Sequence, residues 1–539
     1  MNLKKFALLT ALTLPVAATA AIDKPVSVSG GQLQGIPAKD PSIVVFKGIP
    51  FAAAPVGDLR WRAPQPVAKW NGVRQASTFG ANCIQQIADE RKPWTYEFMA
   101  HGEISEDCLY LNVWSVAKTA QDKLAVYVFF HGGGNVEGSG SVPAYDGEGL
   151  AKKGVVVVTV NYRLGILGTL IHPELTAEAP YRASGNYGNL DAIAALHWVH
   201  DNIAQFGGDP SKVTIGGQSA GSGYVHNMVA SPLAKGLFRG AIAESGSQVG
   251  IEMGGRPIKE MEQLGVEFAN AKGANSIAAL RKLSWQQIVA PVPAATPGAP
   301  ARQFRFGTVV DNYVFIAPNG ETIAQGKHND VPTLTGSNSN EYGAAAAQTF
   351  TVASFGKLAR DRYAELADEF MKLYPASSDQ QATAIAKDAA RDQARTSTNL
   401  WARDRARTSH TKTFTYFWNH PLPGPDSAMF GAFHTGEIPY VMNSLAMSNR
   451  PFTANDRKLA DTMSSYWTNF IKTGDPNGAG LPHWPAVSDS PGMVMAVGEQ
   501  FAPIPLAGSK AKQAFMEKYL TAKPRPRLGA TSGYPGSSD

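Results

Sequence analysis

The sequence is poor in cysteine and in net charge, and each shortage excludes a class of protein. Only Cys83 and Cys108 occur among 539 residues, without the spacing of a zinc or redox site. The formal net charge is +5, and it falls to +3 without Lys4 and Lys5, as 47 basic minus 44 acidic residues. We therefore expect no metal, and no nucleic-acid partner, because binding nucleic acid requires clustered positive charge.

Long apolar runs are also missing, apart from one at the N-terminus. Lys4 and Lys5 precede an apolar run over residues 6–18, and Ala-Thr-Ala at 18–20 is a small-x-small cleavage site. A membrane span needs about 20 apolar residues, so the pattern predicts a secretory signal peptide at 1–20 and no membrane span. The protein is then exported, periplasmic or secreted. An isolated cysteine pair in an exported protein favours a disulfide.

Runs of β-branched residues alternate with helical patterns along the rest of the chain. Residues 124–130 and 154–160 are continuously apolar, which is typical of strands buried on both faces of a parallel sheet. An apolar stripe predicts a helix over 190–203. Further strands are expected at 212–215, 240–245, 331–336 and 412–418, a surface loop at 291–303 and a flexible tail at 523–539. The alternation predicts one α/β domain over 21–522, with a mostly parallel sheet flanked by helices.

Ser219 lies in the pattern G-x-S-x-G, between an expected strand and an expected helix. Gly217 and Gly221 flank it at two positions on either side. One interpretation is a flexible surface loop. The other is a nucleophile on a strained strand-to-helix turn, where any Cβ two positions away would strike the neighbouring backbone. The strand before Ser219 and the helix after it favour the nucleophile.

A second glycine cluster follows the strand expected at 124–130. His131 is followed by Gly132, Gly133 and Gly134, whose bare backbone lets N–H groups approach a carbonyl oxygen closely. A glycine hinge or a phosphate loop is the alternative, but neither GxGxxG nor GxxxxGK[ST] can be read here. A reactive serine also needs a base oriented by an acid. Among the downstream histidines, the residues alone do not choose between His410, His420, His434 and His483.

Eight segments together resemble the type B carboxylesterases, in the order of that family and over most of the chain. They are KGIPFAAAPVGDLRWRAPQP, SEDCLYLNVW, FFHGGG, NYRLGILG, GNYGNLD, FGGDPSKVTIGGQSAGS, ESGS and GAFHTGEIPYV. The resemblance implies an α/β-hydrolase fold, no cofactor, and hydrolysis of a small-molecule ester through an acyl-enzyme. It leaves the oligomeric state open.

The resemblance also assigns individual residues. Ser219 matches the nucleophile, Glu341 the acid and His434 the base. The oxyanion hole would consist of Gly133, Gly134 and the N–H of Ala220. Cys83 and Cys108 match the first disulfide of the family. Arg60 with Glu106, and Arg163 with Asp191, resemble its structural ion pairs.

Two departures from the family bear on the substrate. Gln218 stands where glutamate is often found, and Asn135 where an aromatic residue is common. The missing negative charge argues against choline esters and favours a neutral ester, with aromatic esters as candidates. Trp94, Tyr96 and Phe98, between the two cysteines, are candidates for an aromatic pocket wall, or they pack that loop against the body. An amide, carbamate or lactone substrate, and a non-catalytic binding role, are the alternatives.

Overall fold

The computed structural model describes most of the chain. The described residues are 22, 24–246, 258–293, 301–341 and 348–522. The signal peptide predicted at 1–20 and the tail predicted at 523–539 lie outside them, as does the centre of the loop predicted at 291–303. The domain limits of 21 and 522 stay predictions.

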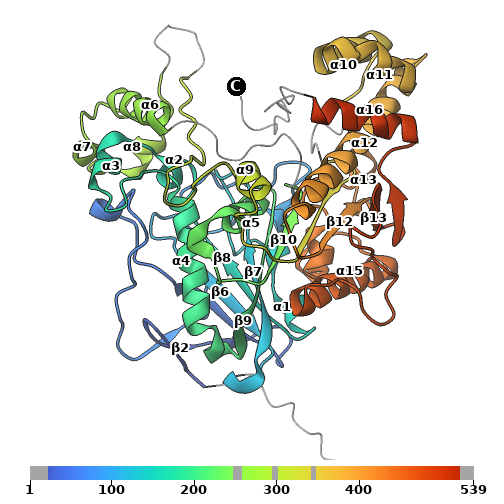
Figure 1. The fold of residues 1–539 in the computed structure, drawn as a ribbon. Coiled ribbons are helices and arrows are strands. Elements are labelled where there is room, and N and C mark those ends of the chain that lie inside the picture. The colour runs from blue at the N-terminus through green and yellow to red at the C-terminus, as the bar shows by residue number, and fades with distance from the viewer. Residues whose placement is uncertain (1–21, 23, 247–257, 294–300, 342–347, 523–539) are drawn as a thin grey trace, which may run out of the picture.

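An eleven-stranded sheet forms the centre of the molecule (Figure 1). From one edge to the other it runs β14 (Ala502–Pro505), β13 (Met493–Val497), β12 (Thr413–Trp418), β11 (Thr333–Asn338), β10 (Gly240–Glu244), β9 (Gly208–Gln218), β7 (Leu124–Phe130), β8 (Val155–Val160), β6 (Tyr110–Ser115), β4 (Val44–Pro50) and β3 (Ile36–Pro37). From β13 to β8 all neighbours are parallel, and the outer pairs are antiparallel. This confirms the predicted α/β fold with a mostly parallel sheet.

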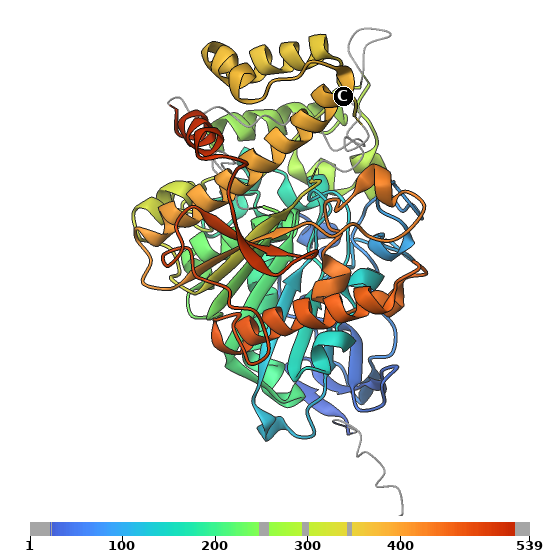
Figure 2. The same ribbon diagram turned by 90° about the vertical axis from the view of Figure 1, so that its right-hand side faces the viewer.

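Helices cover both faces of the sheet. The central strands are covered by α4 (Tyr187–Asn202) and α5 (Ala220–Ala230) on one face, and by α15 (Ala454–Thr473) on the other, where Figure 2 shows it in orange. The remaining helices are α1 (Glu148–Ala151), α2 (Gly165–Thr169), α3 (Pro173–Glu178), α6 (Ile258–Ala271), α7 (Ile277–Arg281), α8 (Trp285–Val289), α9 (Asn319–Ala324), α10 (Val352–Tyr363), α11 (Ala367–Leu373), α12 (Asp379–Ala406), α13 (Ser427–Phe430), α14 (Ile438–Val441) and α16 (Lys510–Thr521). No helix in the described part of the chain is long and apolar enough to span a bilayer.

Alternate residues of the central strands enter two separate cores. In β7, Val126 and Val128 join the core beneath α4 and α5, whereas Tyr127 and Phe129 join the core that contains Trp467 of α15. Because side chains alternate across a strand, a strand covered on both faces must be apolar throughout. This is why the uninterrupted apolar run at 124–130, like that at 155–160, forms a central strand.

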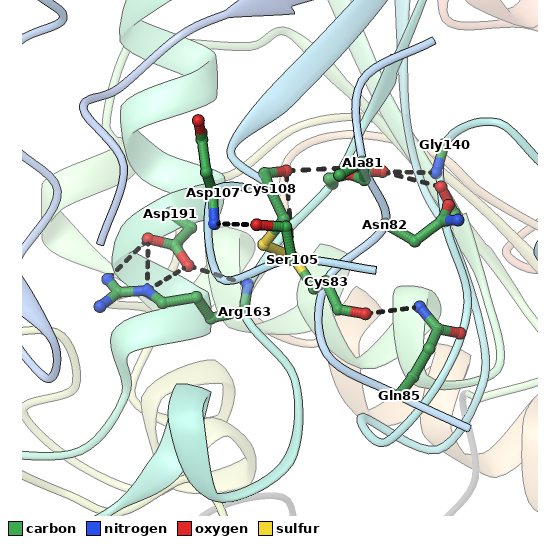
Figure 3. The surroundings of a disulfide bond; sticks show 12 residues. Ala81, Asn82, Cys83, Gln85, Ser105, Asp107, Cys108, Gly140, Arg163 and Asp191 are labelled. Carbon is green, nitrogen blue, oxygen red and sulfur yellow. Dashed lines mark hydrogen bonds and ion pairs between the residues drawn. A yellow bond between two sulfur atoms is a disulfide. The ribbon is translucent and has the colours of Figure 1, made fainter. Parts of the chain in front are cut away.

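Three covalent or ionic links expected from the resemblance are present. Cys83 and Cys108 form a disulfide, and Figure 3 shows it close to the Arg163–Asp191 pair. The Arg163 side chain binds both carboxylate oxygens of Asp191 from its Nε and Nη2 atoms, with a shortest distance of 2.7 Å. Asp191 is fully buried and also accepts the backbone N–H of Arg163. The second pair, Arg60 with Glu106, is bidentate, with both distances at 2.6 Å.

The buried pair leads to a stability prediction. We expect Asp191→Ala to lower the free energy of unfolding by about 3–5 kcal/mol, because the Arg163 guanidinium is left buried without its counter-ion. Denaturant unfolding followed by fluorescence measures this. Asp201→Ala, on the same helix but 61% exposed at the side chain, is the control and should change stability by less than about 0.5 kcal/mol. A loss of under 1 kcal/mol for Asp191→Ala would contradict the prediction.

Candidate active site

Ser219 lies on a sharp turn between β9 and α5. Its backbone has φ 58° and ψ −119°, a conformation that a non-glycine residue adopts only when the surroundings impose it. Its N–H donates to Glu244 O at 2.9 Å, which ties the turn to the end of β10. A Cβ on Gly217 would lie 2.4 Å from Gly221 O, and one on Gly221 would lie 2.0 Å from Phe130 O. The prediction that both positions require glycine for space is therefore confirmed.

The glycine loop, residues 131–138, lies directly beside Ser219. A Cβ on Gly132 would come within 3.2 Å of Ser219 Cβ. Gly133 and Gly134 both have positive φ, at 107° and 62°, and among the described residues their N–H groups donate to no protein acceptor. The N–H of Ala220, the first residue of α5, has no acceptor within its helix. In the part of the chain that the structure describes, N–H groups without a protein acceptor thus lie in the loop beside Ser219 and at the start of the helix after it.

His131 anchors the start of this loop. Its Nδ1 lies 2.7 Å from Gly132 O, its ring stacks on Tyr162, and the Tyr162 hydroxyl donates to His131 O at 2.6 Å. Burial lowers the pKa of His131 to about 4, so the ring is neutral at physiological pH. His131 is therefore a structural support and cannot supply a charge to the site.

The predicted base and acid are in contact. His434 Nδ1 lies 2.5 Å from Glu341 Oε2, and the other oxygen of Glu341 accepts the backbone N–H of Asn338 at 2.6 Å. Glu341 follows β11 closely, and the register of β9, β10 and β11 aligns Gln218, Glu244 and Gly336 at the carboxyl ends of the strands. Ligands and reactive groups of open α/β sheets gather at this end.

Geometry distinguishes His434 from His420, another histidine that contacts acids. Both ring nitrogens of His420 face carboxylates: Nδ1 faces Glu499 at 2.5 Å and Nε2 faces Asp456 at 3.0 Å. No nitrogen of His420 is left to take a proton from a serine. In His434 the carboxylate of Glu341 faces Nδ1, whereas Nε2 lies 3.0 Å from the side-chain nitrogen of Gln218.

Two further buried carboxyl groups belong to this region: Glu437 interacts electrostatically with His434, and Glu244 with Glu437. No sequence pattern singles out either residue, although Glu437 is in the same segment as His434. Asn338 donates from its side chain to Glu437 Oε2 and to Phe433 O, so it links Glu437 to the segment that carries His434. Burial and the charge of Glu341 raise the pKa of Glu437 to about 7. Burial and the charge of Glu437 raise the pKa of Glu244 well above its usual range.

These charges set the protonation of His434. Burial by itself lowers the pKa of an imidazole, but here the charge and hydrogen bond of Glu341, aided by the charge of Glu437, outweigh burial and raise the pKa of His434 above its usual value. The proton-accepting nitrogen is therefore more basic than that of an isolated histidine.

The residues predicted to line a substrate pocket lie in different places. Gln218 is buried, with its amide on His434, and Asn135 is exposed at the tip of the glycine loop. Trp94 donates its indole N–H to His434 O at 3.0 Å. Tyr96 is 57% exposed and stacks on His101, while Phe98 is buried against Phe433. Only Gln218 and Trp94 of the five thus lie against the histidine.

Comparison with known proteins assigns the class. A profile of the carboxylesterase family matches residues 22–517. The chain is 36% identical over 510 residues to a fumonisin B1 esterase of Sphingopyxis macrogoltabida, covering 92% of this chain and 90% of that protein. It is 32% identical over 497 residues to a human cocaine esterase, covering 84% of both chains, and 32% identical over 485 residues to a liver carboxylesterase 1F of Rattus norvegicus, covering 82% and 84%.

The chain therefore belongs to the carboxylesterase family. It is an α/β-hydrolase and an enzyme that hydrolyses carboxylic esters. The resemblance read from the eight sequence segments is confirmed.

The charges around His434 lead to a prediction about pH. An imidazole accepts a proton only when neutral, so kcat/KM should fall on the acid side with a midpoint above about 6.5, the ordinary histidine pKa. Gln218→Glu adds a negative charge beside Nε2 and should move this midpoint up by about one pH unit. Glu437→Gln removes a charge of the same sign and should move it down. Both variants preserve shape, so shifts in the same direction would contradict this account.

Proposed function

We propose that ester hydrolysis proceeds through an acyl-enzyme on Ser219. The Ser219 hydroxyl attacks the ester carbonyl while His434 takes its proton, and Glu341 orients the imidazole and stabilises its charged form. The N–H groups of Gly133, Gly134 and Ala220 bind the oxyanion. The alcohol leaves with the proton from His434, and water then releases the acid by the same steps in reverse.

The observation that carries this proposal is the strained turn at Ser219, with the glycine loop against it. The strained backbone of Ser219, at φ 58°, is explained if its hydroxyl has to be held exposed at the end of β9. The free N–H groups of the glycine loop, the dipole at the start of α5 and the His434–Glu341 contact all lie at this end of the sheet. Together they supply the nucleophile, base, orienting acid and oxyanion donors that acyl transfer requires.

For the substrate we propose a neutral carboxylic ester, with aromatic esters as the first candidates. The residue before Ser219 is an amide, so no carboxylate at that position attracts a cation. The Trp94 ring lies edge-on to His434, with centroids 6.5 Å apart. The named relatives include a fumonisin B1 esterase and a cocaine esterase. Amides, carbamates and lactones would use the same groups, and only assays separate them.

The test is hydrolysis of para-nitrophenyl esters from acetate to decanoate, with para-nitroanilides assayed in parallel. The parent protein should hydrolyse the esters. Ser219→Ala should lose about 10⁴-fold or more in kcat, because the hydroxyl that attacks the ester is removed. Ser222→Ala, three residues further on in α5, is the matched control and should remain active. Equal rates for the parent and Ser219→Ala would contradict the role of Ser219, and faster anilide turnover would favour the amide alternative.

We also propose that the protein is exported, periplasmic or secreted, with 1–20 as a cleaved signal peptide. The support is the basic and apolar N-terminal pattern together with the Cys83–Cys108 disulfide. On expression with its full N-terminus in a Gram-negative host, the chain should lose 20 residues. Intact-mass measurement of the purified protein should then give a chain that begins at Ala21. A mass that includes Met1 would contradict this.

A further inference from the structure

The loop closed by the disulfide, residues 83–108, lies against two separate parts of the active site. It is here called the disulfide loop. Arg91 and Trp94 form an isolated antiparallel bridge, with backbone hydrogen bonds of 2.7 and 2.8 Å in the two directions. The Arg91 side chain contacts the glycine loop, and the Trp94 side chain contacts the segment that carries His434. The single turn from Arg91 to Trp94 therefore connects the glycine loop with the segment that carries His434.

On one side the disulfide loop holds the glycine loop. Arg91 Nη1 lies 2.5 Å from Glu137 Oε1. Glu137 N donates to Gly133 O, and a Cβ on Gly133 would lie 2.1 Å from Glu137 O, so Glu137 fixes the conformation of Gly133. Gln85 adds a reciprocal pair of hydrogen bonds with the backbone of Gly138, both of 2.8 Å. Figure 3 shows Gln85 beside the disulfide.

On the other side the disulfide loop holds the segment that carries His434. The Trp94 indole N–H donates to His434 O at 3.0 Å and lies 3.4 Å from the Thr435 hydroxyl. Thr435 has φ 81°, an unfavourable backbone conformation for a β-branched residue. External contacts must therefore maintain the backbone directly after the histidine, and the indole is one of them.

Neighbouring contacts strengthen this second attachment. Phe98 packs edge-on against Phe433, with ring centroids 5.7 Å apart. Arg450 bonds Glu97 and Thr95 of the disulfide loop, at 2.5 and 2.7 Å, and its guanidinium lies over the Phe98 and Phe433 rings. The chain on both sides of His434 thus packs against the disulfide loop.

We propose that the disulfide loop is a positioning element, in which Arg91 and Trp94 hold the oxyanion donors and His434 in register with each other. This inference rests on the proposed function. Acyl transfer needs both groups within a fraction of an ångström of their working positions, and such precision depends on the residues that support them. Arg91 acts through Glu137 of the glycine loop and Trp94 through the backbone of His434, so we assign them as positioning residues and not as catalytic ones.

The first experiment replaces the indole but keeps an aromatic ring. Trp94→Phe should lower kcat for a para-nitrophenyl ester about tenfold while KM changes by less than about twofold, because one hydrogen bond to the His434 backbone is lost and the ring stays. Trp70→Phe is the matched control. Its indole donates to Gln32 O at 2.9 Å in the small sheet of β1 (Val26–Val28), β2 (Gly31–Gln34) and β5 (Val73–Gln75). The Trp70→Phe variant should leave kcat unchanged.

The second experiment tests the contact with the glycine loop. Arg91→Glu and Glu137→Arg should each lower kcat about fivefold or more, because two like charges then face each other. The double variant restores opposite charges and should recover most of the loss, which a generally damaged fold would not do. Glu90→Gln, an exposed change beside Arg91, should leave kcat as in the parent.

The outcomes separate this inference from the proposed function. If the parent hydrolyses esters, Ser219→Ala does not, and Trp94→Phe has the kcat of the parent, the positioning role is refuted and the acyl-enzyme stands. A lower melting temperature for Trp94→Phe with unchanged kcat would also refute it, since the contact would then only stabilise the fold. A double variant no faster than the single ones would remove Arg91 from the account. No ester hydrolysis by the parent would overturn both proposals.

Discussion

The close backbone contact between the turn at Ser219 and the end of β7 constrains the rest of the site. Gly221 lies so near Phe130 O that even a methyl group would overlap it. Because the chain continues from Phe130 into the glycine loop, this contact also places the loop beside Ser219. Ser219 and the glycine loop are thus placed side by side by a backbone contact between the start of α5 and the end of β7, which needs no bridging side chain.

The electrostatics of the site follow from burial. Three carboxyl groups, on Glu244, Glu341 and Glu437, share a region from which water is largely excluded. Like charges that close cannot all be ionised in a low dielectric, so the pKa values of Glu244 and Glu437 are raised, and Glu341 keeps the direct contact with the imidazole. The neutral amide of Gln218 beside His434 Nε2 avoids a fourth acid in the same region.

Sequence patterns were sufficient for the architecture, because burial on both faces leaves a signature in each strand. The apolar runs at 124–130 and 154–160 and the G-x-S-x-G turn correspond to β7, β8 and the turn at Ser219. The pairing of His434 with Glu341 could not be read from spacing, since the two lie 93 positions apart and other acids and histidines follow Ser219. The resemblance suggested this pair, and its members do lie in contact.

The disulfide loop shows a second limit of sequence reasoning. Trp94, Tyr96 and Phe98 have the same spacing and similar chemistry, yet one contacts the His434 backbone, one is exposed and one is buried. Which aromatic ring meets the site depends on how the loop folds, and that depends on contacts with Glu137, Phe433 and Arg450 from three distant segments. Periodicity cannot encode such contacts, because the loop has almost no regular structure of its own.

That irregularity gives the disulfide its physical role. The loop has one short 3₁₀ turn, one internal bridge between Arg91 and Trp94, and one bridge from Ile104 to Asn82, so its order comes mainly from its attachments. Cys83 and Cys108 are both buried next to β6, and closing a loop of 25 residues removes about 3 kcal/mol of freedom from the unfolded chain. The covalent bond therefore fixes both ends of the loop to the sheet, and the contacts of Arg91 and Trp94 carry that rigidity to the glycine loop and to His434.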